Sequence, residues 1–448
     1  MGIFNKIFGF SNGEQAQPDI MFGRFNDSYK SDGKYKAWDR SLEHFEKQEY
    51  LDSYRMFFDF LMDDQSGNLS YKYDKEKDLI TFELYQGSKK VEGRIHDGSI
   101  RAEAKIANSE VNELGILRKL IEMNFNLKYS RYALDRDENI TMVFNSYFLD
   151  CSPYKLYYAL KELSTSADKQ DDLFIKKFEG LEPVNTGHVR QISEKEIQSK
   201  YNFFKKKIEF VLDQFENGKL DKVTYPGGKT FQLLDAVYKL DYLLKPEGLV
   251  MESFEKIHKG FFKNDNNTVH KKNSDIVKEL QRIIEIPFED FSEEIYEVLS
   301  TFGVTVPTSY EQYKTFAQAE LANMDWYIDN KYLDVGRSIP SYIIGYSLFN
   351  YALPNPLAEL FHLYYNITEC GFFKELGFSC QYLDEDGELQ EREIKKSLNN
   401  IRQKFRDAFP NFNPRKYNLN YKSLESFSKS FIVMTLNLNL DKANNKSG

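Results

Sequence analysis

The motif with the clearest chemical meaning is Tyr225-Pro226-Gly227-Gly228-Lys229-Thr230, which ends in the Gly-Lys-Thr triplet of a phosphate-binding loop. A complete loop has another glycine five residues before Gly228, because the backbone must wrap around the phosphates there, and this chain has Val223. The stretch in front of the motif is also too short for the strand that precedes a nucleotide site. We therefore predict a Pro-Gly-Gly turn that leads into a helix. A nucleotide-dependent enzyme or switch that uses residues 228–230 remains the alternative function.

The other reactive side chains form no catalytic or metal-binding pattern. The six histidines have neither HxxxH nor HExxH spacing; they are His44, His96, His188, His258, His270 and His362. His362 lies in an aromatic helical stretch, where we expect a buried or half-buried histidine with a hydrogen-bond partner. The acidic groups at 289–294 and 384–387 are typical of helix starts and turns. The sequence therefore predicts no catalytic residue, no cofactor and no metal, and a protein that is not an enzyme.

The three cysteines, Cys151, Cys370 and Cys380, form no CxxC pair. Their spacing argues against a disulfide scaffold and against a structural zinc site. Cys370 and Cys380 are near enough in sequence to approach each other. In a reducing cytoplasm, however, we expect two small buried thiols.

Composition and length describe a globular protein with more than one domain. The chain has 448 residues, 41% hydrophobic and 29% charged, with a formal charge of −9. This acidic balance argues against nucleic-acid binding, which needs an excess of Lys and Arg. No apolar run is long enough to span a membrane. The first ten residues resemble neither a signal peptide nor a myristoylation site, so we predict a cytoplasmic protein, with a weak membrane-surface helix as the open alternative for this segment.

A helix is predicted over residues 41–63, and more than half of its circumference is apolar. One face carries Tyr50, Leu51, Tyr54, Phe57, Phe58 and Leu61. The neighbouring flank carries four further apolar residues, Leu42, Phe45, Met56 and Phe60. Because one sheet face cannot cover both, we predict that these four bind a second surface. That surface is the tethered helical domain, which is favoured, a second copy of the chain, or a client segment.

Period-two segments follow this helix. Apolar residues alternate with polar ones around residues 69–73, 80–84, 91–95 and 100–106, and Asp97-Gly98 is a strong two-residue hairpin signal. An antiparallel meander is the simplest topology. Its second face is polar and predicted to be open to solvent, with Glu92, Arg94, Arg101, Glu103 and Lys105.

A helix at 112–125 comes next, with its apolar residues inward: Leu114, Ile116, Leu117, Leu120 and Ile121. Strands around 128–134 and 140–144 then form a hairpin, and a helix opens at Ser152-Pro153 and runs to about residue 178. This order predicts an α+β domain of one antiparallel sheet and about three helices, over residues 40–180.

That order of elements carries a family resemblance. The resemblance is carried by the segment from Asn126 to Asp135, the segment from Asn139 to Phe144 and the closing helix at 154–163. The region resembles the YbjN-like branch of the type III secretion chaperone-like superfamily. The resemblance covers about residues 40–180, and Asp97-Gly98 departs from it by splitting one long strand. It implies a small non-enzymatic domain whose relatives bind extended polypeptide segments or pair with themselves.

The remaining chain is predicted to be mainly helical. Residues 1–39 read as a polar, partly ordered lead, residues 181–190 as a linker, and residues 441–448 as a disordered tail. Between 191 and 440 the period changes to 3.6, and helices are predicted at nine places: 192–217, 230–244, 253–262, 274–286, 292–302, 309–327, 339–351, 356–376 and 388–409. A short strand is expected at 378–384. Together with the resemblance and the missing catalytic spacing, this organisation predicts an adaptor or chaperone-like protein that binds another protein or itself.

Overall fold

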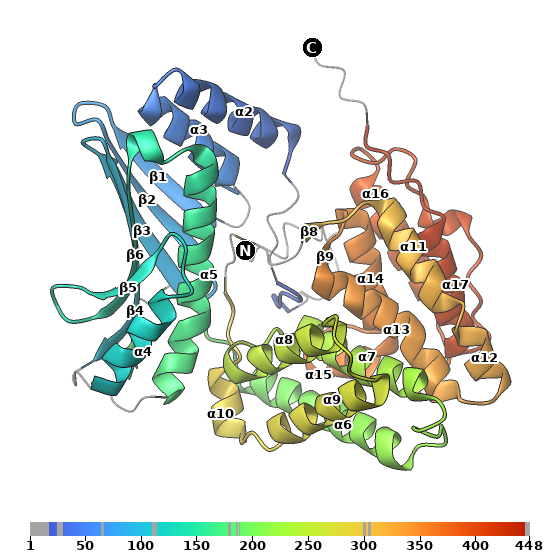
Figure 1. The fold of residues 1–448 in the computed structure, drawn as a ribbon. Coiled ribbons are helices and arrows are strands. Elements are labelled where there is room, and N and C mark those ends of the chain that lie inside the picture. The colour runs from blue at the N-terminus through green and yellow to red at the C-terminus, as the bar shows by residue number, and fades with distance from the viewer. Residues whose placement is uncertain are drawn as a thin grey trace.

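The computed structural model describes residues 18–24, 30–63, 67–109, 114–177, 181–184, 187, 189–298, 302 and 306–443. It consists of an N-terminal part built around an antiparallel sheet, here the sheet domain, and a mainly helical part, here the helical domain (Figure 1). The predicted change from a sheet with helices to a helical region is therefore confirmed. The first ten residues and positions 444–448 lie outside the described residues.

The sheet has the order β1-β2-β3-β4-β6-β5, and β7 pairs with β4 beyond this path. Its strands are β1 (Leu69–Asp74), β2 (Leu79–Gln86), β3 (Lys89–His96), β4 (Ser99–Ser109), β5 (Arg131–Leu134), β6 (Ile140–Tyr147) and β7 (Leu181–Pro183). The pairings between these seven strands are antiparallel, so the predicted meander and the later hairpin are confirmed. Part of the stretch predicted as a linker therefore belongs to the sheet, because β7 forms there.

The predicted turn at Asp97-Gly98 is a tight two-residue hairpin. His96 pairs with Ser99, and the two turn residues have φ angles of 49° and 69°. Two consecutive positive φ angles match the twist of the flanking strands, which is why Asp-Gly is favoured at such a turn.

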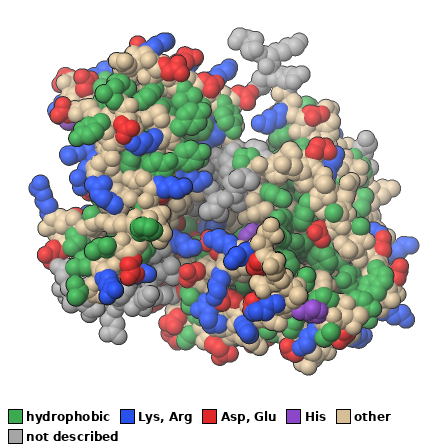
Figure 2. All heavy atoms as spheres, in the orientation of Figure 1, with side chains coloured by type: hydrophobic (Ala, Val, Ile, Leu, Met, Phe, Trp, Pro, Cys, Tyr) green, Lys and Arg blue, Asp and Glu red, His purple; other side chains and the backbone are tan. Residues whose placement is uncertain are grey.

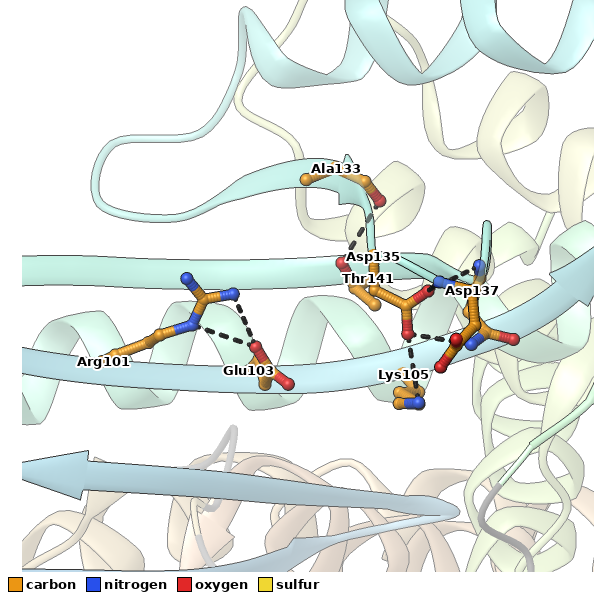
Figure 3. Close-up of polar contacts among 8 residues, drawn as sticks. Arg101, Glu103, Lys105, Ala133, Asp135, Asp137 and Thr141 are labelled. Atoms are coloured by element: carbon orange, nitrogen blue, oxygen red, sulfur yellow. Dashed lines mark hydrogen bonds and ion pairs between the residues drawn. The ribbon is translucent and has the colours of Figure 1, made fainter.

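Helices cover one face of the sheet, and the other face is open (Figure 1). The covering helices are α3 (Tyr50–Leu61), α4 (Leu114–Asn124) and α5 (Pro153–Lys177), and α2 (Asp32–Glu46) packs on α3 and α5. On the open face, Arg101 and Glu103 of β4 pair at 2.8 Å, and Lys105 pairs at 3.0 Å with Asp135 of the β5–β6 hairpin (Figure 3). The predicted polar face is confirmed, because its charges pair with one another in contact with solvent.

The region predicted as one helix over 41–63 is a pair of helices, α2 and α3. The chain turns between them at Gln48, whose φ is 62°. The two helices pack closely because Ser41 Oγ donates to the Ser53 carbonyl at 2.8 Å and Ser53 Oγ donates to the Ser41 carbonyl at 2.7 Å. The prediction of a single helix was wrong because these long-range contacts stabilise a turn that the apolar pattern does not reveal.

The apolar residues predicted to point inward from α4 divide between two faces. Ile116 and Leu120 are buried, whereas Leu114 and Ile121 are 82% and 72% exposed. Only Ile116 and Leu120, which are four residues apart on one side of α4, pack into the core of the sheet domain. The prediction that all five residues point inward was therefore wrong for Leu114 and Ile121.

The helical domain contains most of the predicted helices, with shifted ends. They are α6 (Glu194–Asn217), α7 (Pro226–Leu244), α8 (Gly248–Phe262), α9 (Val269–Ile283), α10 (Phe288–Glu293), α11 (Tyr310–Leu321), α12 (Met324–Asp329), α13 (Leu333–Asn350), α14 (Asn355–Thr368), α15 (Cys370–Glu375), α16 (Glu391–Phe405) and α17 (Leu424–Leu436). The sequence analysis missed α17. The helix predicted at 292–302 was wrong, because α10 ends at Glu293. The strand expected at 378–384 is reduced to an isolated bridge between Leu383 and Leu389.

Cys370 and Cys380 are joined in a disulfide, so the prediction of two free thiols was wrong. α15 is short, and the chain reverses after it at Gly377, whose φ is 93°. This reversal brings the two Cα atoms to 5.7 Å, which is a distance that a disulfide spans.

Each domain receives a segment from outside its own sequence range. Ile20 belongs to the core of the helical domain, and the Phe22 ring lies 5.0 Å from that of Phe373. In the opposite direction, Phe302 is buried in the sheet domain's core, where its N–H donates to Gln86 Oε1 at 2.9 Å. Residues 18–24 of the polar lead are thus a structural part of the helical domain, whereas residues 32–39 form the start of α2 in the sheet domain.

Candidate functional site

The four residues predicted to bind a second surface lie on two neighbouring helices. Leu42 and Phe45 belong to α2, Met56 and Phe60 belong to α3, and all four are half-buried. The Phe60 ring packs against Trp38 of α2 at 4.9 Å. The Phe45 ring packs against Tyr50 at 5.4 Å. Part of the predicted second surface is therefore supplied by the helix pair itself.

A continuous group of aromatic rings extends outward from this helix pair. Trp38 lies at its centre and packs edge-on against Tyr154 at 5.0 Å and against Tyr157 at 6.3 Å, both on α5. Tyr157 in turn packs against Tyr158 at 5.5 Å. We call the group of six rings the aromatic surface; its members are Tyr35, Trp38, Phe60, Tyr154, Tyr157 and Tyr158.

Three members of the aromatic surface remain about half exposed. The exposed fractions are 49% for Tyr35, 53% for Tyr154 and 53% for Tyr158. Figure 2 shows hydrophobic side chains gathered on the part of the sheet domain that carries α2 and α3. Three neighbouring tyrosines that pack on half-buried rings and still face solvent are typical of a protein-binding surface.

Helical spacing explains why these rings meet. Tyr35, Trp38, Leu42 and Phe45 recur every three or four residues and so share one face of α2. Tyr154 and Tyr158 are four residues apart on α5 and share a face there. The sequence analysis missed the tyrosines of α5, although their spacing was visible, because only the tertiary structure brings that helix beside α2.

Charges of both signs border the aromatic surface. The Lys30 ammonium lies 5.3 Å from the centre of the Phe60 ring, and Lys34 Nζ donates to the Asp59 carbonyl at 2.7 Å. Lys155 pairs with Asp150 at 2.6 Å beside the first turn of α5. Because the border has no single sign, it favours an apolar or aromatic ligand over a strongly charged one.

The Gly-Lys-Thr motif is the first part of α7, as predicted. Pro226 occupies the first turn, Lys229 is buried, and its Nζ donates to the Gln214 carbonyl at the end of α6. Thr230 Oγ1 bonds Asn273 Oδ1 at 2.8 Å. The strands in the described part of the helical domain are only the short pair β8 (Val306–Pro307) and β9 (Tyr351–Ala352), so the motif does not follow a sheet of the kind that nucleotide-binding loops require.

The interior of the helical domain holds a cluster of four charges that the sequence analysis did not single out. Glu369 accepts from Lys207 at 2.7 Å and from Lys239 at 3.0 Å, and Lys239 also pairs with Asp235 at 3.2 Å. Burial raises the pKa of Asp235. Burial also opposes ionisation of Glu369, but the two lysines outweigh it and lower the pKa of that carboxyl. This arrangement holds α6, α7 and the α14–α15 junction together.

The prediction for His362 is confirmed. Asn366 Nδ2 lies 3.1 Å from His362 Nε2, and Tyr242 Oη lies 3.0 Å from His362 Nδ1. Because Asn366 donates to Nε2, the proton of the neutral ring sits on Nδ1. Burial, helped by the charge of Lys404, lowers the pKa of His362 to about 4. Among the described residues, no group of three or more His, Cys, Asp or Glu could hold a metal ion.

Comparison with known proteins gives no assignment. No protein-family model matches the chain, and no curated protein matches it. Within the described residues, none of the helices combines the length and the apolar character needed to cross a bilayer.

Proposed function

We propose that this chain is a non-enzymatic protein-interaction factor of the cytoplasm, an adaptor or chaperone-like protein that binds an apolar segment of another polypeptide. The observation that carries the proposal is the set of half-exposed tyrosines around Trp38 on α2 and α5. The resemblance of residues 40–180 to the YbjN-like secretion chaperones supports it, since relatives of that kind bind extended segments or pair with themselves.

The energetics of the aromatic surface favour a protein ligand. Complete burial of a large apolar side chain contributes on the order of 1.5–3 kcal/mol, so covering a half-exposed ring contributes about 1 kcal/mol. Tyrosines also keep a hydroxyl for hydrogen bonds at the edge of an interface. Trp38 and its neighbours already hold the tyrosines in place, so little side-chain entropy is lost on binding.

Leu42, Phe45, Met56 and Phe60 have a supporting role in this proposal. The ring contacts of Phe45 and Phe60 lie within α2 and α3, which ties these residues to the shape of the helix pair. Phe60 belongs to the aromatic surface, and all four residues are less exposed than its three outer tyrosines. A partner therefore touches the tyrosines first.

The nucleotide-dependent alternative has less support. Lys229 and Thr230 already bond a carbonyl of α6 and the Asn273 amide of α9, so both side chains have a structural role in the helical domain. Calorimetry with ATP and GTP tests the alternative directly. Heat that disappears in Lys229→Ala would favour it.

The test of the proposal compares peptide binding by two variants. We expect the double variant Tyr154→Ser with Tyr158→Ser to lose at least tenfold in affinity for apolar and aromatic peptides of an immobilised peptide array. The matched control is Phe210→Ser, because Phe210 is 52% exposed but lies on α6 of the helical domain. Thermal melting shows whether each variant is folded.

Light scattering distinguishes a second copy of this chain from a different polypeptide as the partner. A dimer that becomes a monomer in the double variant identifies a second copy as the ligand. Equal peptide binding and equal mass in the wild type and the double variant would refute the aromatic surface as a binding site. Phe45→Glu with Phe60→Glu is expected to lower the melting temperature as well, because those rings pack inside the helix pair.

A further inference from the structure

A small cavity lies where the end of α6, the start of α7 and the start of α13 meet. Its volume is about 160 Å³, below the roughly 300–1,000 Å³ usual for the sites of drug-sized ligands. Its lining includes Lys219, Lys229, Gln232, Lys331 and Arg337, with Asp334 as the acidic member. The cavity is thus small and predominantly cationic.

Three of the four cations lack a carboxylate partner. Lys219 and Lys331 form no ion pair with any described residue, and the buried Lys229 ammonium donates to the Gln214 carbonyl. An ammonium has three N–H donors, so Lys229 keeps two for a ligand. Arg337 is already paired with Glu425 at 2.5 Å and approaches Asp334 at 3.8 Å.

The first turn of α13 adds backbone donors to the same cavity. Residues 333–335 line it, and no side chain caps this 18-residue helix. The amide groups at the start of a helix are not used inside the helix, and the helix dipole makes that end positive. The N-terminus of α13 therefore attracts an anion at the point where the lysines converge.

Gln232 supplies the observation that points to a specific ligand. Its side chain is only 7% exposed, it lines the cavity, and its Oε1 has no hydrogen-bond partner. A buried amide oxygen without a donor is unfavourable by roughly 1–3 kcal/mol. A ligand that satisfies it must carry a proton as well as negative charge.

We propose that this cavity binds hydrogen phosphate, with the lysines and the α13 amides on its unprotonated oxygens and its P–OH group donating to Gln232 Oε1. Sulfate has the same shape but carries no proton at neutral pH, so it leaves Gln232 unsatisfied. A nucleotide is too large for the cavity. The site is separate from the aromatic surface, and its failure would leave the proposed function standing.

Other charged residues near the cavity also affect how strongly it attracts an anion. Lys222 adds positive charge but is paired with Glu216, and Asp221 lies close enough to affect Lys229. Burial, followed by the charge of Lys222, lowers the pKa of Lys229. A bound anion would raise the pKa of Lys229, so the anion binds best while Lys229 is protonated.

The experiment is calorimetric titration of the full chain at constant ionic strength with inorganic phosphate, sulfate and ATP. We expect phosphate to bind at least tenfold more tightly than sulfate, and ATP to bind no more tightly than phosphate. Lys219→Ala with Lys331→Ala should weaken phosphate at least tenfold, and Gln232→Leu should abolish the preference over sulfate.

The control removes two equally exposed lysines elsewhere, Lys206→Ala with Lys278→Ala, and should leave phosphate binding unchanged. Absence of phosphate binding at about 10 mM, an equal loss in the control, or equal binding of sulfate would each overturn the proposal. Much tighter binding of ATP would also overturn it, because the cavity would then admit a nucleotide.

Discussion

The sheet domain and the helical domain place their charges in opposite ways. In the sheet domain, Arg101 and Glu103 pair on an open face that water reaches. In the helical domain, Lys239 and Glu369 pair inside the core. A strand turns alternate residues to opposite faces, so polar groups separate from apolar ones without further help. α7 is buried on nearly all sides, so its charged residues must find partners in the interior.

The domains also differ in what completes them. The helical domain takes up residues 18–24, which carry Ile20 and Phe22 into its core. The sheet domain takes up Phe302, whose ring lies 5.2 Å from that of Tyr157. A further contact between the domains is the ion pair between Lys169 of α5 and Glu255 of α8 at 2.9 Å. We conclude that neither sequence range is a closed unit.

The largest expected effect tests the contrast between buried and open charges. Glu369→Gln should reduce the free energy of unfolding by about 3–5 kcal/mol, because it leaves the half-buried Lys207 without its carboxylate and the buried Lys239 with Asp235 alone. Glu103→Gln, which breaks a pair on the open face, should change it by less than about 1 kcal/mol. Urea denaturation measures both. Similar losses in the two variants would contradict the contrast.

The next effect concerns acid stability of the helical domain. His362 has a folded pKa of about 4 and an ordinary value of 6.5, so between these values the unfolded chain binds a proton that the folded chain does not. Above pH 6.5 the titration of His362 therefore takes nothing from the free energy of unfolding. As the pH falls from 6.5 to 4, this titration lowers the free energy of unfolding by about 3 kcal/mol in total.

Denaturation from pH 7 to pH 4 measures this dependence. His362→Gln should flatten it, after any loss of packing is subtracted at pH 7. His96→Gln, at the exposed end of β3, is the control and should leave the curve as in the wild type. An unchanged slope in His362→Gln would show that another group is responsible.

A smaller effect tests how the N-terminal segment is held on the helical domain. Arg24 pairs with Asp241 at 2.6 Å and also donates to the Pro246 carbonyl. Arg24→Met should reduce stability by about 2 kcal/mol, since hydrogen bonds to charged groups contribute about 1.5–3 kcal/mol. Hydrogen exchange at the Gly23 amide, which donates to the Tyr242 carbonyl at 2.9 Å, should become faster. Unchanged exchange there would mean that Phe22 alone anchors the segment.

The smallest effect tests the β3–β4 turn. Gly98 has a φ of 69° and free space around it, so Gly98→Ala should cost about 1–2 kcal/mol through backbone strain alone. Gly98→Asn should cost less, because asparagine tolerates this conformation better. Thermal melting compares the two. An alanine variant as stable as the asparagine variant would show that the turn relaxes to another geometry.

Much of the fold was visible in the sequence. The strands around 80–84 and 91–95, the turn at Asp97-Gly98 and the helix that opens at Ser152-Pro153 were predicted from patterns within a few residues. Such patterns persist because each strand or helix turns its apolar side chains toward one core. The family resemblance and the function stay predictions.

The candidate site was visible only in part. Phe60 and Phe45 were chosen from one apolar stripe, but Tyr154 and Tyr158 come from a helix about a hundred residues further along the chain. Periodicity within one helix says which side is apolar and not which helix it meets.

The sequence by itself determined the order of the elements, the polar open face of the sheet and the change to a helical second half. Tertiary structure alone decided the turn at Gln48, the Cys370–Cys380 disulfide, the exchange of Phe22 and Phe302 between the domains, and the pairing of Lys239 with Glu369. The physical reason is the distance along the sequence over which each kind of interaction acts. Local backbone preferences and periodic burial act over a few residues, whereas these four features depend on contacts between segments that are brought together only when the whole chain packs.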